Sequence, residues 1–73
     1  MNNYIIDIAK SVFNEMDAVI KLCEKQNRPE DCQRLLLFKP QLEKFLQQRL
    51  DYSEVMEDLT FASDRIYEFK KVI

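Results

Sequence analysis

Glycine and histidine are both absent from this chain of 73 residues, and each absence excludes a group of structures or functions. Glycine normally supplies the positive φ angles of tight hairpin turns and of the residue after a helix, and it forms phosphate-cradling loops. Histidine is the commonest general base and a frequent metal ligand. We therefore expect no sheet with many hairpins, no glycine-rich nucleotide-binding loop and no catalysis that depends on imidazole.

Long apolar runs are also missing. No stretch of about 18 apolar residues occurs, so we expect no membrane-spanning helix. The first residues carry no positive charge, and Asp7 interrupts the apolar run behind them. That pattern is atypical of a secretory signal peptide and leaves the cytoplasm as the expected location.

Apolar residues nevertheless make up 47% of the chain, beside 33% charged residues. This combination is typical of a folded protein, because disordered chains combine low hydrophobicity with high net charge. The length leaves room for one domain, residues 1–73. A domain of this size buries only about 60% of its unfolded surface, so we expect surplus apolar surface that a partner or a second copy would cover.

Residues 3–26 have the apolar spacing of one amphipathic helix. Its apolar arc spans about 200° at 100° per residue, whereas a single packing partner needs only about 100°. We therefore expect this helix to contact two neighbours. The stripe consists of Ile5, Ala9, Val12, Met16, Val19 and Cys23, one flank of Ile6, Phe13 and Ile20, and the other flank of Tyr4, Ile8 and Leu22.

A second helix is predicted over residues 30–50, because Pro29 suits a first helical turn and Glu30 and Asp31 suit the positive end of the helix dipole. Pro40 removes a backbone donor and clashes with the preceding turn. The apolar positions keep their phase across it, which favours one helix kinked at Pro40 and leaves two short helices as the alternative. These positions are Cys32, Leu35, Phe38, Leu42, Phe45, Leu46 and Leu50.

A third helix is predicted over residues 52–72. Asp51 and Glu54 approximate a capping box at its start. The apolar residues that follow step by three and four along one seam. They are Tyr52, Val55, Leu59, Ala62, Ile66, Phe69 and Ile73.

Three helices joined by short connections predict an all-α, antiparallel three-helix bundle. The charges agree with this arrangement, because residues 27–50 carry five basic and three acidic groups and residues 51–73 carry three basic and six acidic groups. Such complementary segments are expected of antiparallel neighbours. The alternative is a long helical hairpin that completes its core only as a dimer, and the matched helix lengths favour the bundle.

Residues with catalytic potential are few. The spacing of Cys23 and Cys32 fits no zinc or thioredoxin-type motif, and we interpret both as small buried apolar residues, with a disulfide as the alternative. The adjacent carboxylates Glu57 and Asp58 point about 100° apart on a helix and suit a solvated surface. We therefore expect no enzymatic activity, no cofactor and no metal site.

The function that remains is a protein-interaction module, such as an adaptor, an inhibitor or a small chaperone. It would bind another protein through an apolar helix face, with a homodimer as a further option. The candidate interface joins one flank of the helix over residues 3–26 to two apolar residues on the polar sides of the later helices. It consists of Ile6, Phe13, Ile20, Leu37 and Phe61.

The alternative is a dimeric, nucleic-acid-associated regulator that uses the basic residues of the second helix. Nucleic-acid-binding surfaces usually form a basic stripe in a protein of high isoelectric point. Here the basic residues scatter around the helix and the isoelectric point is about 5.0, so protein binding is the favoured hypothesis. The basic residues are Arg28, Arg34, Lys39, Lys44 and Arg49.

Overall fold

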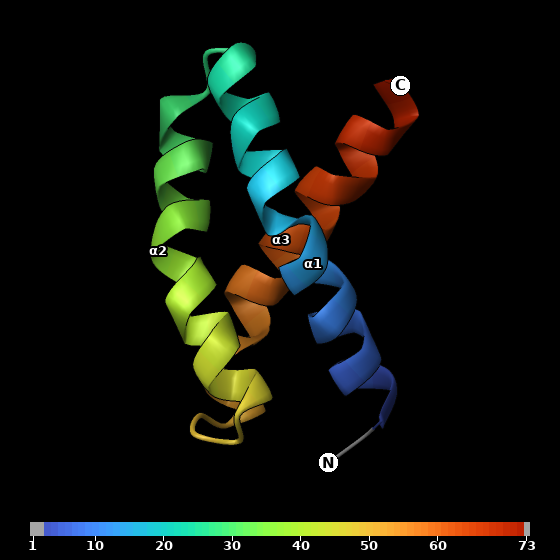
Figure 1. The fold of residues 1–73 in the computed structure, drawn as a ribbon, viewed down its shortest axis with the longest axis vertical. Helices are drawn as coiled ribbons and strands as arrows, with labels where there is room; N and C mark the ends of the chain where they lie inside the picture. The colour runs from blue at the N-terminus through green and yellow to red at the C-terminus, as the bar shows by residue number, and fades with distance from the viewer. Residues whose placement is uncertain (1–2, 73) are drawn as a thin grey trace.

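The computed structural model describes the backbone of residues 3–72 and the side chains of residues 3–71. In this part of the chain it has three helices, α1 (Asn3–Lys25), α2 (Pro29–Leu46) and α3 (Tyr52–Val72). Figure 1 shows α1 and α2 running antiparallel, while α3 returns in the direction of α1 and crosses behind it. Each helix contacts both of the others, so the predicted antiparallel three-helix bundle is confirmed.

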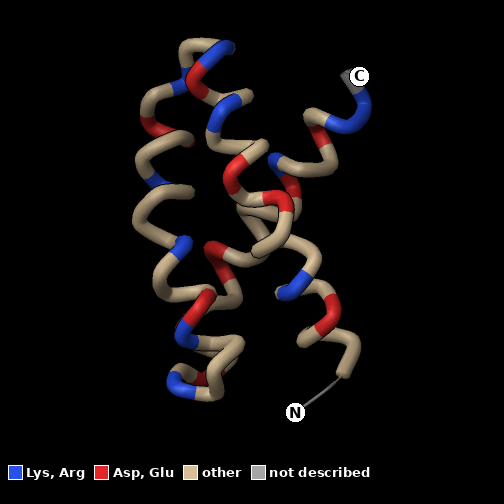
Figure 2. The backbone as a smooth tube through the Cα atoms, viewed as in Figure 1, with Lys and Arg blue, Asp and Glu red and all other residues tan. Residues whose placement is uncertain are grey.

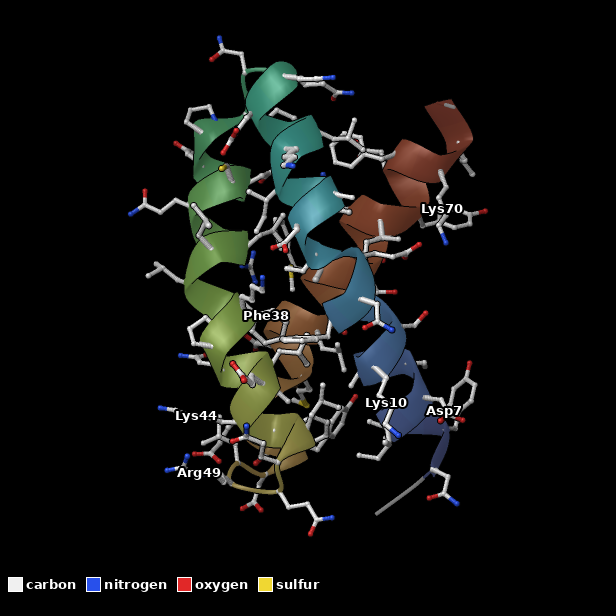
Figure 3. All side chains as sticks on the ribbon, in the orientation of Figure 1. Asp7, Lys10, Phe38, Lys44, Arg49 and Lys70 are labelled. Carbon is white, nitrogen blue, oxygen red and sulfur yellow. The ribbon has the colours of Figure 1, made fainter. Side chains whose placement is uncertain are left out.

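The core takes one apolar stripe from each helix. The predicted stripe of α1 is buried from Ala9 to Cys23, and Phe38 of α2 points between the helices (Figure 3). The predicted seam of α3 is buried from Val55 to Phe69, whereas Tyr52 remains 36% exposed and Ile73 lies outside the described residues. The buried residues are Ala9, Val12, Met16, Val19, Ile20, Cys23, Leu35, Phe38, Leu42, Phe45, Val55, Leu59, Ala62, Ile66 and Phe69.

Pro40 lies inside α2, which continues through it as a single helix. The prediction of one helix rather than two is therefore confirmed. Pro40 itself is exposed, while Phe38 and Leu42 on either side of it are buried. The proline thus falls on the solvent side of the helix, and the core stripe keeps its phase across it.

The end of α2 differs from the sequence prediction, which placed it at residue 50. The helix ends at Leu46, because Gln48 adopts a left-handed conformation with φ of 63°. The Gln48 amide donates to the carbonyl of Phe45 at 3.0 Å, and the Arg49 amide donates to the carbonyl of Lys44 at 2.8 Å. These two bonds form a Schellman motif, which satisfies the last carbonyls of the helix and turns the chain away from its axis.

The same motif ends α1. Asn27 has φ of 55°, and its amide donates to the carbonyl of Glu24 at 3.1 Å. The next amide, that of Arg28, donates to the carbonyl of Cys23 at 2.9 Å. Glycine is the usual residue at this position, so both turns of this glycine-free chain place a side chain where a Cβ is unfavourable. Asparagine tolerates that conformation better than glutamine does.

Replacing Gln48 with glycine is therefore expected to raise the free energy of unfolding by about 1 kcal/mol, as measured by urea denaturation. The left-handed conformation costs a residue with a Cβ about 1–2 kcal/mol, and the freedom of glycine in the unfolded chain offsets only part of that gain. Gln47 has an ordinary φ of −86° and provides the matched control. Gln47→Gly should lower the stability by about 0.5–1 kcal/mol, and equal effects at the two positions would contradict the motif.

The start of α3 confirms half of the predicted capping box. The Asp51 amide donates to Oε2 of Glu54 at 2.8 Å, and the Glu54 amide donates to the carbonyl of Asp51 at 3.0 Å. The Glu54 carboxylate therefore satisfies the amide of the residue that precedes the helix, which is the role of the third helical residue in this motif.

Candidate protein-interaction surface

The predicted interface residues of α1 lie on the side of the helix that the bundle itself uses. Ile20 is only 6% exposed and belongs to the core, while Ile6 and Phe13 are partly buried and pack against it. Lys39 of α2 places its Nζ 5.9 Å from the centre of the Phe13 ring. The structure therefore corrects the assignment of Ile20 as surplus surface, because α2 is one of the two neighbours that the wide apolar arc predicted.

Phe61 of α3 is also partly buried, although it lies outside the predicted apolar seam of that helix. The guanidinium carbon of Arg34 lies 4.1 Å from the centre of its ring, and that of Arg65 lies 5.4 Å away. Arginine stacks favourably on an aromatic face. Phe61 thus supports the packing of two arginines of its own chain and offers only part of its surface to a partner.

A ring of four charged side chains closes the end of the bundle beside the turn between α1 and α2. Arg28 Nη1 lies 2.7 Å from Glu68 Oε1, and Arg28 Nη2 lies 3.0 Å from Asp31 Oδ2. Arg65 Nη1 completes the ring, 2.9 Å from Glu68 Oε2 and 3.8 Å from Asp31 Oδ2. The hydrogen bond from Arg28, and the positive charge of Arg65, lower the pKa of the Glu68 carboxyl below its ordinary value. The ring ties α3 to the start of α2.

Most basic residues of the nucleic-acid alternative are engaged within the chain. Arg28 belongs to the ring, Arg34 Nε lies 3.0 Å from Asp58 Oδ1, and Lys39 Nζ lies 2.5 Å from Asp17 Oδ1. The Arg34 contact pairs α2 with α3, and the Arg28 contact pairs the residue before α2 with α3, in agreement with the complementary charges of residues 27–50 and 51–73. Lys44 and Arg49 point outward (Figure 3), and Figure 2 shows acidic residues on every helix, α2 included. The described residues therefore form no continuous basic stripe.

Both cysteines are free in the structure, Cys23 in the core and Cys32 partly buried. Burial is the main cause that raises the pKa of the Cys23 thiol. Burial and the neighbouring Glu24 carboxylate raise the pKa of the Cys32 thiol, which donates a hydrogen bond to Glu24 Oε1 at 3.8 Å. Neutral thiols are poor nucleophiles and poor metal ligands, and among the described residues no group of three or more histidine, cysteine or acidic residues could hold a metal ion.

Leu37 is the one predicted interface residue that is mainly exposed, at 65%, and it does not stand alone. Its neighbour Leu36 is 53% exposed, and Pro40 is exposed one turn further along. We refer to Leu36, Leu37 and Pro40 as the α2 ridge. The sequence placed Leu37 on the polar side of its helix and assigned no role to Leu36. The two side chains point about 100° apart, and Pro40 lies between them in the helical projection.

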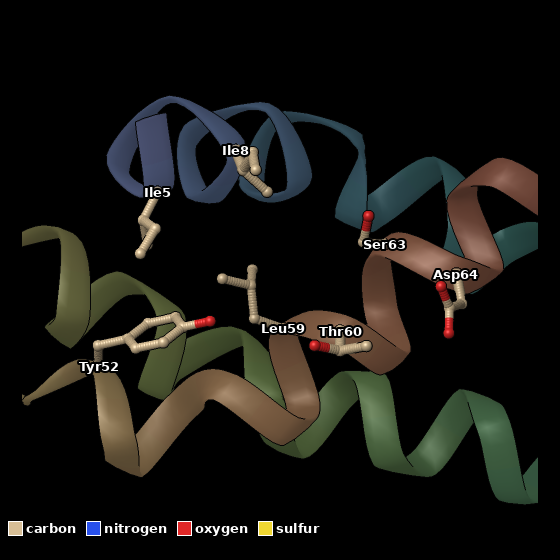
Figure 4. Close-up of a pocket in the computed structure, with 7 residues that line it drawn as sticks. All are labelled: Ile5, Ile8, Tyr52, Leu59, Thr60, Ser63 and Asp64. Atoms are coloured by element: carbon tan, nitrogen blue, oxygen red, sulfur yellow. The ribbon is translucent and has the colours of Figure 1, made fainter. Parts of the chain in front are cut away.

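A second surface, which the sequence did not identify, is a groove between α1 and α3. It consists of two adjacent hollows of about 160 and 240 Å³ that share Ile8 and Ser63 in their linings. Figure 4 shows Ile5 and Ile8 of α1 facing Tyr52 and Leu59 of α3 across the first hollow. We call this surface the α1/α3 groove. Its lining residues are Ile5, Ile8, Ser11, Val12, Glu15, Tyr52, Leu59, Thr60, Ser63, Asp64, Ile66, Tyr67 and Lys70.

Comparison with known proteins gives no relative: no family model, no curated protein and no solved structure matches the chain. Within the described residues, no helix has the length and apolar character that crossing a membrane requires. The case for function therefore depends on the two surfaces described above.

Proposed function

We propose that this chain is a non-enzymatic protein-interaction module that binds another protein through an apolar face of its helices. The observation that carries the proposal is the α2 ridge, where two adjacent leucines outside the buried core are more than half exposed. Single exposed apolar residues are common, but contiguous ones are typical of binding surfaces. The raised pKa values of both thiols support a role other than nucleophilic catalysis. Free thiols also suit the reducing cytoplasm, which we propose as its location.

The proposal is tested by placing a photoreactive amino acid at position 37, on the α2 ridge, or at position 67, on the rim of the α1/α3 groove. Tyr67 is 62% exposed, so either probe would reach a bound partner. Exposed Lys21 on the polar side of α1 is the control position. Illumination in cells of the native host should give a discrete adduct with one other protein at position 37 or 67 and none at position 21.

The masses of the adducts separate the outcomes. An adduct of twice the mass of this chain would indicate a homodimer, which the same apolar surfaces would also support. Adducts of equal yield at all three positions would indicate nonspecific collisions and would contradict the proposal. The lack of any adduct at positions 37 and 67 would contradict it as well.

A further inference from the structure

The three seams between helices differ in how charged side chains cover them. Arg28, Arg34 and Arg65 cross the α2/α3 seam, where they stack on Phe61 and Phe69 and pair with carboxylates. The α1/α2 seam is covered by Lys39, which pairs with Asp17 of α1. Long basic side chains thus shield the apolar edges of both seams.

The α1/α3 seam also has one bridging ion pair, but it differs in the residues that line it. Among the described residues, the only ion pair that bridges it joins Lys70 Nζ to Glu15 Oε1 at 3.0 Å. This pair closes the end of the groove that lies towards the C-terminal end of α3. The remaining groove has Ile5, Ile8 and Leu59 in its lining, and none of the described residues that line its first hollow is basic. Apolar side chains of both helices therefore line an open hollow along this seam.

Large and small residues give the groove its shape. Tyr52 and Tyr67 of α3 stand at its two ends and are both partly exposed. Between them the lining includes Ser11 of α1 and Ser63 of α3. Because these side chains are short, they leave room for a ligand in the middle of the groove. The lining of α1 extends from Ile5 to Glu15, a length of about 15 Å at 1.5 Å per residue, or about three turns of a bound helix.

The charges at the rim have one predominant sign. Asp64 lines the first hollow, Glu57 lines an adjoining hollow that shares Tyr52 and Thr60 with it, and Asp7 lies one turn from Ser11 on α1. None of these three carboxylates forms an ion pair with a described residue. Lys70, the basic residue of the lining, is already paired with Glu15. Lys71 is the exception, because it forms no ion pair with a described residue and its Nζ lies 4.6 Å from the centre of the Tyr67 ring. Unpaired carboxylates therefore outnumber unpaired cations at the rim, and Asp64 and Glu57 lie towards its Tyr52 end.

We propose that the α1/α3 groove binds an amphipathic helix of another protein, about three turns long, whose apolar stripe is flanked by lysine or arginine. The inference rests on the proposed protein-interaction function and assigns to it a surface and a class of partner. A helix ridge fits a groove between two helices and would complete a four-helix arrangement. Basic residues on both sides of its stripe would meet the unpaired carboxylates. A second copy of the chain is less suited to the groove, because a two-fold axis there would bring the same acidic residues together.

The probe is a synthetic 18-residue helical peptide whose central three turns or so carry leucines spaced three and four residues apart, with lysines on both edges of that stripe. The control peptide carries glutamate in place of each lysine. Titration calorimetry with the full chain should give micromolar binding of the lysine peptide and affinity at least about tenfold lower for the glutamate peptide. Equal affinities, or no binding of the lysine peptide, would overturn the proposal.

Two matched double variants locate the binding site. Asp7→Asn with Asp64→Asn should weaken the lysine peptide by about tenfold, whereas Glu30→Gln with Glu43→Gln on the exposed side of α2 should leave its affinity unchanged. Ser63→Trp should abolish binding by filling the middle of the groove. If that variant fails to fold by circular dichroism, the asparagine pair decides the test. The same affinity for the asparagine pair as for the glutamine pair would place the peptide elsewhere and overturn the proposal.

The experiments distinguish failure of the groove as the binding site from failure of the proposed interaction function. A partner adduct at position 37, together with no peptide binding at the groove, would leave the interaction function standing and exclude the groove as its site. A position 67 adduct of twice the chain mass would mean that a second copy occupies the groove, which overturns the choice of partner. Absence of adducts at both positions would instead contradict the function itself.

Discussion

Replacing Phe38 with alanine is expected to lower the free energy of unfolding by about 3–5 kcal/mol. The ring is only 1% exposed and lies between the helices of the bundle (Figure 3), so its removal leaves a cavity that its neighbours fill only in part. A domain of 73 residues has a total stability of about 4–11 kcal/mol at 0.05–0.15 kcal/mol per residue. The substitution should therefore remove a large share of that stability, measured as a lower urea midpoint in equilibrium unfolding.

The neighbouring residue provides the matched control. Leu37 is 65% exposed, and Leu37→Ala should change the stability by no more than about 0.5 kcal/mol. The two substitutions differ by one position on the same helix, so any general effect of alanine on helix formation is shared. A similar loss of stability at both positions would contradict the orientation of α2 in the bundle.

Replacing Pro40 with alanine is expected to raise the free energy of unfolding by about 2 kcal/mol. A proline inside a helix costs about 3 kcal/mol relative to alanine, because it lacks the amide donor and clashes with the preceding turn. Alanine gives the unfolded chain more freedom, which offsets about 0.4–1 kcal/mol of that gain. Pro40 is exposed, so its replacement removes little packing.

Urea denaturation of Pro40→Ala beside Gln41→Ala checks this expectation. Gln41 is the next exposed position of α2, and its replacement should leave the stability within about 0.5 kcal/mol of the parent. A neutral or destabilising effect of Pro40→Ala would show that the packing of α2 depends on the local bend that proline imposes. In that case the proline would be a structural requirement of the bundle rather than a tolerated residue.

Much of the fold could be predicted from the sequence, because each helix carries a periodic apolar pattern. The seam of α3 from Val55 to Phe69 is buried as predicted, and the phase of Leu35, Phe38 and Leu42 correctly indicated one helix across Pro40. The end of α2 could not be predicted, since the helix stops where Gln48 turns left-handed. Glutamine has no known preference for that conformation, so no residue type marked the stop.

The candidate interface was harder to predict than the fold. A wide apolar arc on α1 shows that two neighbours are needed, but it does not show whether they come from the same chain. Ile20 is buried by the bundle itself. Phe61 is covered by Arg34, which lies far away in the sequence, so no local pattern could reveal that contact. The α1/α3 groove depends on how two helices cross and is therefore a property of tertiary structure alone.

The lack of glycine also has a consequence for the unfolded chain. Average usage of about 7% would give a chain of this length about five glycines, each of which would lose roughly 0.5–1 kcal/mol more in backbone entropy on folding than alanine does. This chain begins folding from a more restricted ensemble and so loses less conformational entropy. The left-handed conformations of Asn27 and Gln48 offset part of this entropic gain, because they strain the backbone locally. A domain of 73 residues has little surface to bury. The lower conformational entropy of its unfolded chain therefore contributes to the stability of the folded state.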